Sequence, residues 1–69
     1  MEKIYIKDEF IKLGQALKLA GIAQSGIDAK FMIQDGRVKY NGEIEIRRGK
    51  KVYAGDTIEV DGKLFEVTK

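Results

Sequence analysis

Residues 25–42 read SGIDAKFMIQDGRVKYNG and carry the signals for a helix, for both of its ends and for the strand that follows. Ser25 can accept a hydrogen bond from the free backbone N–H groups at a helix start, and Asp28 stands three residues on as a capping-box-like partner. Gly36 can adopt the left-handed conformation that ends a helix. The segment therefore predicts a helix over 26–35. Its apolar residues recur at helical spacing and are expected to face the core: Ala29, Met32 and Ile33, flanked by Ile27 and Phe31.

The strand that follows, RVKY (37–40), alternates basic and apolar residues. Successive side chains on a strand point to opposite faces, so Val38 and Tyr40 are expected to face inward, and Arg37 and Lys39 outward. The pattern therefore predicts two positive charges on one exposed strand face, directly after a helix end.

Asn41-Gly42 marks a tight turn into a second strand, EIEIR, whose inward residues are expected to be Ile44 and Ile46. A two-residue loop would place acidic residues on the apolar face of this hairpin. We therefore predict a three-residue loop over 41–43, closed by a bulge. The pairs expected from this register are Tyr40 with Ile44, Val38 with Ile46, Lys39 with Glu45, and Arg37 with Arg47.

The segment before residue 25 predicts a short strand, KIYI (3–6), and then a helix over 9–20. Asp8 can cap this helix, and Gly21 can end it. Its residues divide by helical spacing into a buried stripe of Phe10, Leu13, Leu17 and Ala20 and an opposite side with Lys12, Gln15 and Lys18.

The segment after the first hairpin predicts a turn at AGD (54–56) and a second hairpin, TIEV-DG-KLFEV, over 57–67. A two-residue Asp61-Gly62 loop suits this hairpin because it sets Ile58 opposite Phe65 on the core side. The element order is β-α-α-β-β-β-β. This order predicts an α+β class, with two short helices packed on a small, mostly antiparallel sheet.

The composition favours one small domain, residues 1–69, that binds a partner rather than an enzyme. The chain has no cysteine and no histidine, so disulfides, the common metal ligands and the usual catalytic bases and thiol nucleophiles are absent. Ser25 is the only serine, and its role as a helix cap already explains it. We expect no cofactor. The first ten residues lack the apolar region of a signal peptide, and no apolar run could span a bilayer, so we expect a cytoplasmic protein without membrane contact.

The net charge of +2 is unevenly distributed along the chain. Residues 1–36 are neutral, and residues 54–69 carry a net charge of −2. Residues 37–53 hold six basic and two acidic side chains, a local net charge of +4. A focused basic segment favours an anionic partner, although a solvated strand face that uses lysine to protect a sheet edge remains an alternative. Lys30 and Gln34 lie one helical turn apart and lead toward this segment, so we predict one continuous basic strip.

Two segments, FIKLGQALKLAGIAQSGIDAKFMIQDGRVKYNGE (10–43) and VYAGDTIEV (52–60), resemble the RNA-binding domain named after ribosomal small-subunit protein four, in its stand-alone YaaA/YbcJ type. The resemblance implies an αL motif that binds structured RNA through two helices and an adjoining strand. It further implies ribosomal RNA as the partner and a role in ribosome assembly, with possible ribosomal protein contacts. The residues that it places at the surface are Lys12, Ser25, Lys30, Gln34, Arg37, Lys39 and Asn41.

The chain departs from this family at Gly14, where an Asp is common, and at Gly26, where an Arg is common. The basic run RRGKK (47–51) can replace the charge missing at Gly26. The RNA-binding residues predicted from charge and resemblance together are Lys12, Gln15, Ser25, Lys30, Gln34, Arg37, Lys39, Asn41, Arg47, Arg48, Lys50 and Lys51.

A second interpretation is a β-grasp-like protein-interaction module, since residues 41–60 also resemble the later part of small sulfur-carrier proteins. The chain ends in FEVTK rather than in the Gly-Gly that carrier chemistry needs, so only a docking role would fit. We expect a monomer, although the strand at 3–6 could present an edge to a second copy.

Overall fold

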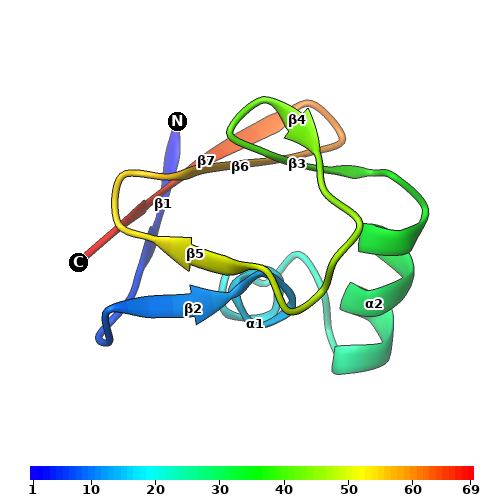
Figure 1. The fold of residues 1–69 in the computed structure, drawn as a ribbon, viewed down its shortest axis with the longest axis horizontal. Coiled ribbons are helices and arrows are strands. Elements are labelled where there is room, and N and C mark those ends of the chain that lie inside the picture. Colours follow the sequence, from blue (N-terminus) through cyan, green and yellow to red (C-terminus); the bar gives the residue numbers. More distant parts are fainter.

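The computed structural model describes residues 1–69 and contains two sheets and two helices (Figure 1). Its elements are β1 (Glu2–Tyr5), β2 (Phe10–Lys12), α1 (Leu13–Leu19), α2 (Gly26–Gln34), β3 (Val38–Tyr40), β4 (Glu43–Ile44), β5 (Lys51–Tyr53), β6 (Thr57–Val60) and β7 (Lys63–Thr68). The larger sheet has the order β1-β7-β6-β3-β4, with β1 parallel to β7 and the other pairs antiparallel. The smaller sheet pairs β2 with β5 antiparallel. The predicted α+β class is confirmed.

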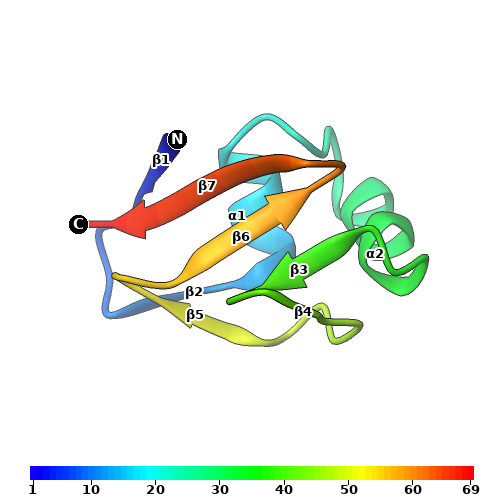
Figure 2. The ribbon, with the colours of Figure 1, turned by 90° about the horizontal axis from the view of Figure 1, so that it is seen from above.

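The larger sheet forms one layer, and α1 with the smaller sheet forms the other (Figure 1). Figure 2 shows α1 behind β6 and β7, with α2 at one end of the molecule and both chain termini toward the opposite end. A single core of buried hydrophobic side chains lies between the layers, and no charged side chain is buried. Neither helix combines the length and the apolar character that a membrane-spanning helix needs.

The predicted second helix forms as α2, and both of its ends are confirmed. The Asp28 N–H donates to Ser25 Oγ at 3.1 Å, and Asp28 Oδ2 accepts the Gln24 N–H at 3.0 Å. This reciprocal pair satisfies two backbone donors at the helix start. Gly36, with φ of 77°, follows the helix in the left-handed conformation. Ser25 therefore acts first as a structural cap.

The apolar face of α2 is narrower than predicted. Ala29, Met32 and Ile33 are buried, as their spacing indicated. Phe31 is 57% exposed and Ile27 is 67% exposed, so the assignment of Phe31 to the core is wrong. A helix at the end of the molecule packs on one side only, which leaves these two residues in solvent.

The first helix begins later than predicted, because Phe10–Lys12 form strand β2 rather than a helical turn. Asp8 does not cap it. The N–H groups of Leu13 and Gly14 instead donate to two carbonyls of segment 47–50, at 2.8 and 3.0 Å. The helix start is thus stabilised by a segment distant in sequence, which local capping rules cannot foresee.

Strands β2 and β5 were both missed by the sequence pattern. Their register sets Phe10 opposite Tyr53, with ring centroids 5.9 Å apart, and Phe10 is only partly buried. Leu13 and Leu17 are buried as predicted, and Ala20 packs at the margin of the core. The observed order is therefore β-β-α-α-β-β-β-β-β.

The β3–β4 hairpin differs from the predicted form. Tyr40 pairs with Glu43, so the loop is the two-residue Asn41-Gly42, with φ of 49° and 89°. A tight turn of this kind needs two residues that tolerate positive φ, and Asn-Gly supplies them. Ile44 and Ile46 are 59% and 62% exposed rather than inward-facing, because β4 is a two-residue edge strand with no buried face.

The cross-strand pairs predicted from the three-residue loop are therefore absent. Lys39 lies opposite Ile44 rather than Glu45, and no pair joins Arg37 and Arg47. The second hairpin, by contrast, has the predicted Asp61-Gly62 loop and sets Ile58 opposite Phe65.

Candidate functional site

A polar concavity of about 340 Å³ lies where the starts of α1 and α2 meet the segment that leads into β5. No hydrophobic residue and no acidic residue lines it. We call it the basic concavity, and its lining residues are Lys12, Gly14, Gln15, Lys18, Gly26, Arg48 and Gly49. Its three positive charges have no ion-pair partner within the domain.

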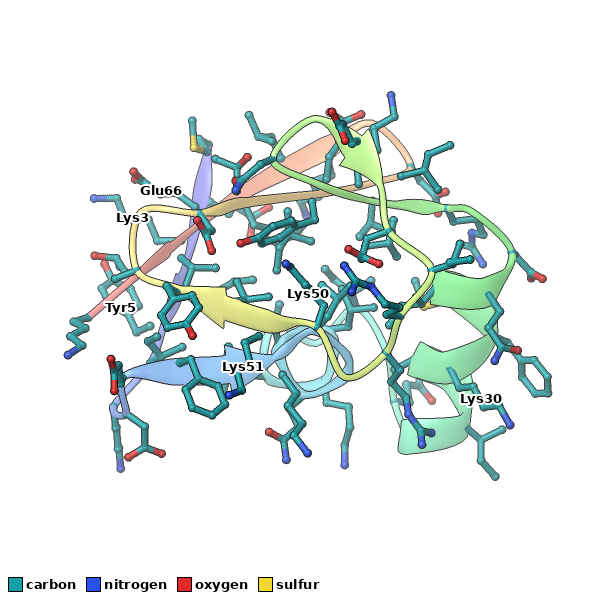
Figure 3. All side chains as sticks on the ribbon, viewed as in Figure 1. Lys3, Tyr5, Lys30, Lys50, Lys51 and Glu66 are labelled. Atoms are coloured by element: carbon teal, nitrogen blue, oxygen red, sulfur yellow. The ribbon has the colours of Figure 1, made fainter.

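The smaller sheet adds a fourth unpaired charge beside the basic concavity. Lys51 on β5 is the direct cross-strand partner of Lys12 on β2. Like charges directly opposite each other destabilise a sheet. Lys51 Nζ lies 4.8 Å from the Phe10 ring centroid, which relieves part of this repulsion (Figure 3). Such a pair is unfavourable for folding.

Helix α2 extends the same surface. Lys30 follows Gly26 by one helical turn, and Figure 3 shows it projecting into solvent from α2. Gln34 lies one turn further and is exposed. We define the basic surface as the exposed side chains that flank or line the basic concavity: Lys12, Gln15, Lys18, Lys30, Arg48 and Lys51.

Two of the predicted arginines are paired with acids of the same domain. Arg37 binds Asp61 through Nε at 3.2 Å and through a second nitrogen at 2.5 Å. Arg47 binds Glu45 through contacts of 3.0 and 3.1 Å. The hydrogen bonds to the carboxylates raise the pKa of both arginines, and the bond from Arg37 lowers the pKa of Asp61. The bond from Arg47 lowers the pKa of Glu45 to about 2. These charges are satisfied internally.

Lys50 is half-buried, unlike the other predicted residues, and points into the molecule in Figure 3. Its Nζ lies 5.0 Å from the Tyr40 ring centroid. The Tyr40 hydroxyl donates to Asp56 at 2.6 Å. Burial, together with this bond to a carboxylate, raises the pKa of Tyr40 to about 12. Burial also acts to raise the pKa of Asp56, but the hydrogen bonds that it accepts outweigh this and lower it.

Asn41 also serves the fold. Its Oδ1 accepts the Thr57 N–H at 2.7 Å, and its Nδ2 donates to Asp56 at 3.2 Å. Lys39 lies on the outer face of the larger sheet, since its neighbours Val38 and Tyr40 face the core. The continuous basic strip predicted from Lys30 through Arg37 and Lys39 is interrupted at Arg37, whose charge is paired with Asp61.

Sequence reasoning missed Lys18 and the three glycines of the basic concavity. The signal for Lys18 was present, since it shares a helix side with Gln15, three residues away. The signal for the glycines was not, because the concavity depends on the packing of segment 47–50 against α1. The structure brings together Lys12, Gln15, Arg48 and Lys51 from the prediction.

The fold and this surface define a small α+β domain with an αL motif beside a cluster of free positive charges. The family model described as the S4 domain matches residues 4–68, and the chain belongs to this family.

Known relatives share most of its length. A Bacillus subtilis (strain 168) protein named "Probable ribosome maturation protein RlbA" is 48% identical over 59 residues, which cover 86% of this chain and 83% of that protein. YbcJ of Escherichia coli (strain K12) is 38% identical over 61 residues, 88% of this chain and 87% of YbcJ. A tyrosine–tRNA ligase of Nitrosomonas europaea is 48% identical over 42 residues, 61% of this chain but 10% of the ligase.

The solution structure of E. coli YbcJ superimposes with a TM-score of 0.75 and 34% sequence identity, covering 100% of this chain and 89% of YbcJ. That structure is described as revealing an αL motif involved in RNA-binding.

Proposed function

We propose that the chain is a non-catalytic RNA-binding domain that recognises hairpin or double-stranded RNA through the basic surface. One observation carries this proposal. The cations of the basic surface have no acidic partner in the domain, although Arg37 and Arg47 nearby do. Unpaired charges held together at the cost of cross-strand repulsion are best explained by a polyanion that neutralises them.

The rigidity of the surface suits recognition by shape. A-form RNA presents phosphates and 2′-hydroxyls across a wide, shallow minor groove, and proteins bind it largely without reading base edges. The charges lie on β2, α1, α2, β5 and the segment before β5, and α1 and α2 pack against each other.

The natural RNA in this proposal is ribosomal RNA, and the role is in ribosome assembly. The name of the B. subtilis relative and the fold shared with YbcJ support this choice. A monomeric single domain of this size would act in the cytoplasm as a binding module, with ribosomal proteins as possible neighbours on the particle.

Titration of an RNA hairpin at several salt concentrations tests the binding step. If the five cations of the basic surface neutralise about five phosphates, log K falls with log salt with a slope of about −4. The variant Lys12→Ala/Lys51→Ala should weaken binding about tenfold or more, since two phosphate contacts are lost. Arg37→Ala/Lys39→Ala tests the two strand residues predicted from the sequence and should have a smaller effect, because Arg37 is already paired with Asp61. Binding without salt dependence would contradict the proposal.

Co-sedimentation of the tagged protein with ribosomal particles at low and high salt tests the target. Salt-sensitive association with a subunit or its precursor would support ribosomal RNA. Protein that stays at the top of the gradient at low salt, while still binding hairpins, would point to another structured RNA.

A further inference from the structure

Arg48 packs so closely on Gly14 that any side chain at position 14 would collide with it. A Cβ atom at Gly14 would lie 2.7 Å from Arg48 Cγ and 3.3 Å from Arg48 Cδ. The Gly14 N–H also donates to the Arg48 carbonyl at 3.0 Å. Both the backbone and the side-chain stem of Arg48 therefore rest on the first turn of α1, and only glycine at position 14 leaves room for the stem.

A second glycine of the basic concavity, Gly26, has open space beside it. A Cβ atom at Gly26 would meet no atom within 4 Å, and the backbone there has no conformation that requires glycine. The space beside Gly26 belongs to the concavity that Lys12, Lys18 and Arg48 also line. A group that enters this space meets three positive charges and no negative one.

Arg47 provides the contrast that identifies Arg48 as special. The two arginines are adjacent, but Arg47 gives both of its side-chain contacts to Glu45. Arg48 makes no side-chain hydrogen bond or ion pair within the domain and lines the basic concavity. Guanidinium groups bind phosphate oxygens well because their N–H donors form a planar fork.

We propose that the basic concavity is a phosphate-binding subsite in which Arg48, seated by Gly14, is the principal binding side chain. This inference rests on the proposed function, since the phosphate it assigns is one from the backbone of the bound RNA. Lys12 and Lys18 contribute two further positive charges to its lining, and the small residues Gly14 and Gly26 keep the subsite open.

The first test compares two charge-matched variants, Arg48→Ala and Arg47→Ala, in titrations of one RNA hairpin. Each removes a single positive charge from neighbouring positions, so any effect of net charge is equal. Arg48→Ala should weaken binding about tenfold and reduce the salt slope by about one, the loss of one phosphate contact. Arg47→Ala should weaken it by about twofold or less. Equal losses would overturn the subsite and leave the proposed function standing.

The second test is a double-mutant cycle with Gly14→Ala. The added methyl group should displace the Arg48 side chain, so Gly14→Ala should weaken RNA binding about as much as Arg48→Ala. In the Arg48→Ala background the same change should have no further effect on affinity. Additive losses would show that Gly14 acts independently of Arg48 and would overturn the proposed seating. Circular dichroism of each variant shows that the fold is retained.

A free anion distinguishes the sources of the phosphate. Pyrophosphate is titrated into the labelled protein, and the backbone amide signals of Gly14, Gly26 and Gly49 are followed by NMR. Shifts of these signals with both pyrophosphate and the hairpin support the subsite as part of the RNA surface. Shifts with pyrophosphate in a protein that binds no hairpin would support the subsite for a free phosphate compound and overturn the proposed function. A protein that binds the hairpin without shifts of these signals would overturn the subsite alone.

Discussion

Arg47 and Arg48 are adjacent and chemically identical, but only the charge of Arg47 is paired within this domain. Arg47 is held by Glu45, and Arg48 is free beside the basic concavity. At the residue scale, then, a count of positive charges does not measure the charge available to a ligand. The sequence predicted that the segment 37–53 is basic, but only the packing shows which of its charges are unpaired.

A substitution at Gly26 tests whether the charge inside the basic concavity matters for binding, because it should affect binding and leave stability almost unchanged. Gly26→Asp places a carboxylate in the first turn of α2, where it interacts favourably with the helix dipole, so stability should change by no more than about 0.5 kcal/mol. The same carboxylate enters the basic concavity and competes with phosphate. We expect RNA binding about fivefold or more weaker than in the neutral control Gly26→Asn. Equal affinities of the two variants would contradict this, and thermal unfolding checks stability.

Glu45 should make the stability of the domain depend on acid. Its folded-state pKa of about 2 lies below the ordinary value of 4.5 because Arg47 hydrogen bonds to its carboxylate. A depressed carboxylate pKa contributes stability above the unfolded pKa, and this contribution is lost as the pH falls through the window from 4.5 to about 2.

Urea unfolding of the wild type and of Glu45→Gln measures this contribution. Between about pH 5 and about pH 2, the wild type should lose about 1 kcal/mol more than the variant, a modest value because the ion pair lies near solvent. Other carboxylates titrate equally in both proteins, so they cancel in the difference. Parallel pH profiles for the two proteins would show that the pair does not contribute.

At the scale of elements, local signals succeeded where a segment supplies its own partners. Helix α2 begins at the predicted cap Ser25 and is followed by the predicted Gly36, and the β6–β7 hairpin has the predicted loop. The predicted start of helix α1 was wrong because its first N–H groups donate to carbonyls of segment 47–50, more than thirty residues away in sequence. The predicted loop of the β3–β4 hairpin was wrong because the apolar residues Ile44 and Ile46 implied a buried face. A short edge strand such as β4 has no buried face.

The errors in the predicted elements also affected the predicted site. Lys12 was expected on a helix, where it would have no strand partner, and β2 was needed to place it opposite Lys51. The basic concavity exists only because segment 47–50 packs on α1, a tertiary contact without a local sequence signal. Charge type could be predicted from the sequence, and the arrangement of the charges could not.

The hydrogen bond from Tyr40 to Asp56 connects the larger sheet to the turn between β5 and β6, so it should matter to the whole second half of the fold. Tyr40→Phe removes this bond and leaves the half-buried Asp56 short of one donor. We expect a loss of about 1–2 kcal/mol in the free energy of unfolding. Tyr53→Phe is the control, because its hydroxyl makes no hydrogen bond in the domain, and it should change stability by about 0.5 kcal/mol or less. Similar losses in both variants would remove the role assigned to the Tyr40 bond.

At the scale of the whole molecule, the net charge of +2 hides an unequal division between two ends. Lys3 on β1 lies opposite Glu66 on β7 (Figure 3). Lys51 on β5, by contrast, lies opposite Lys12 on β2. The pair on β1 and β7 is therefore of opposite charge. On the side that holds the basic concavity, the cross-strand pair Lys12–Lys51 is instead of like charge.

Two charge reversals, Lys51→Glu and Lys3→Glu, separate the location of charge from its total, since each lowers the net charge from +2 to zero. Lys51→Glu creates a favourable pair with Lys12 but loses the contact with the Phe10 ring, so stability should change by no more than about 0.5 kcal/mol. Lys3→Glu sets two carboxylates opposite each other and should cost about 0.5–1 kcal/mol.

The variant that loses less stability, Lys51→Glu, should lose more RNA affinity. Lys51→Glu should weaken hairpin binding about tenfold or more, because it replaces a phosphate contact with a repulsive charge. Lys3→Glu should weaken it about twofold at most, because at moderate salt a charge at the far end of the domain is screened. Titrations of both variants at one ionic strength, with urea unfolding in parallel, check the pair. Equal losses of affinity would mean that RNA binding depends on net charge alone. This result would contradict the assignment of the basic surface as the binding site.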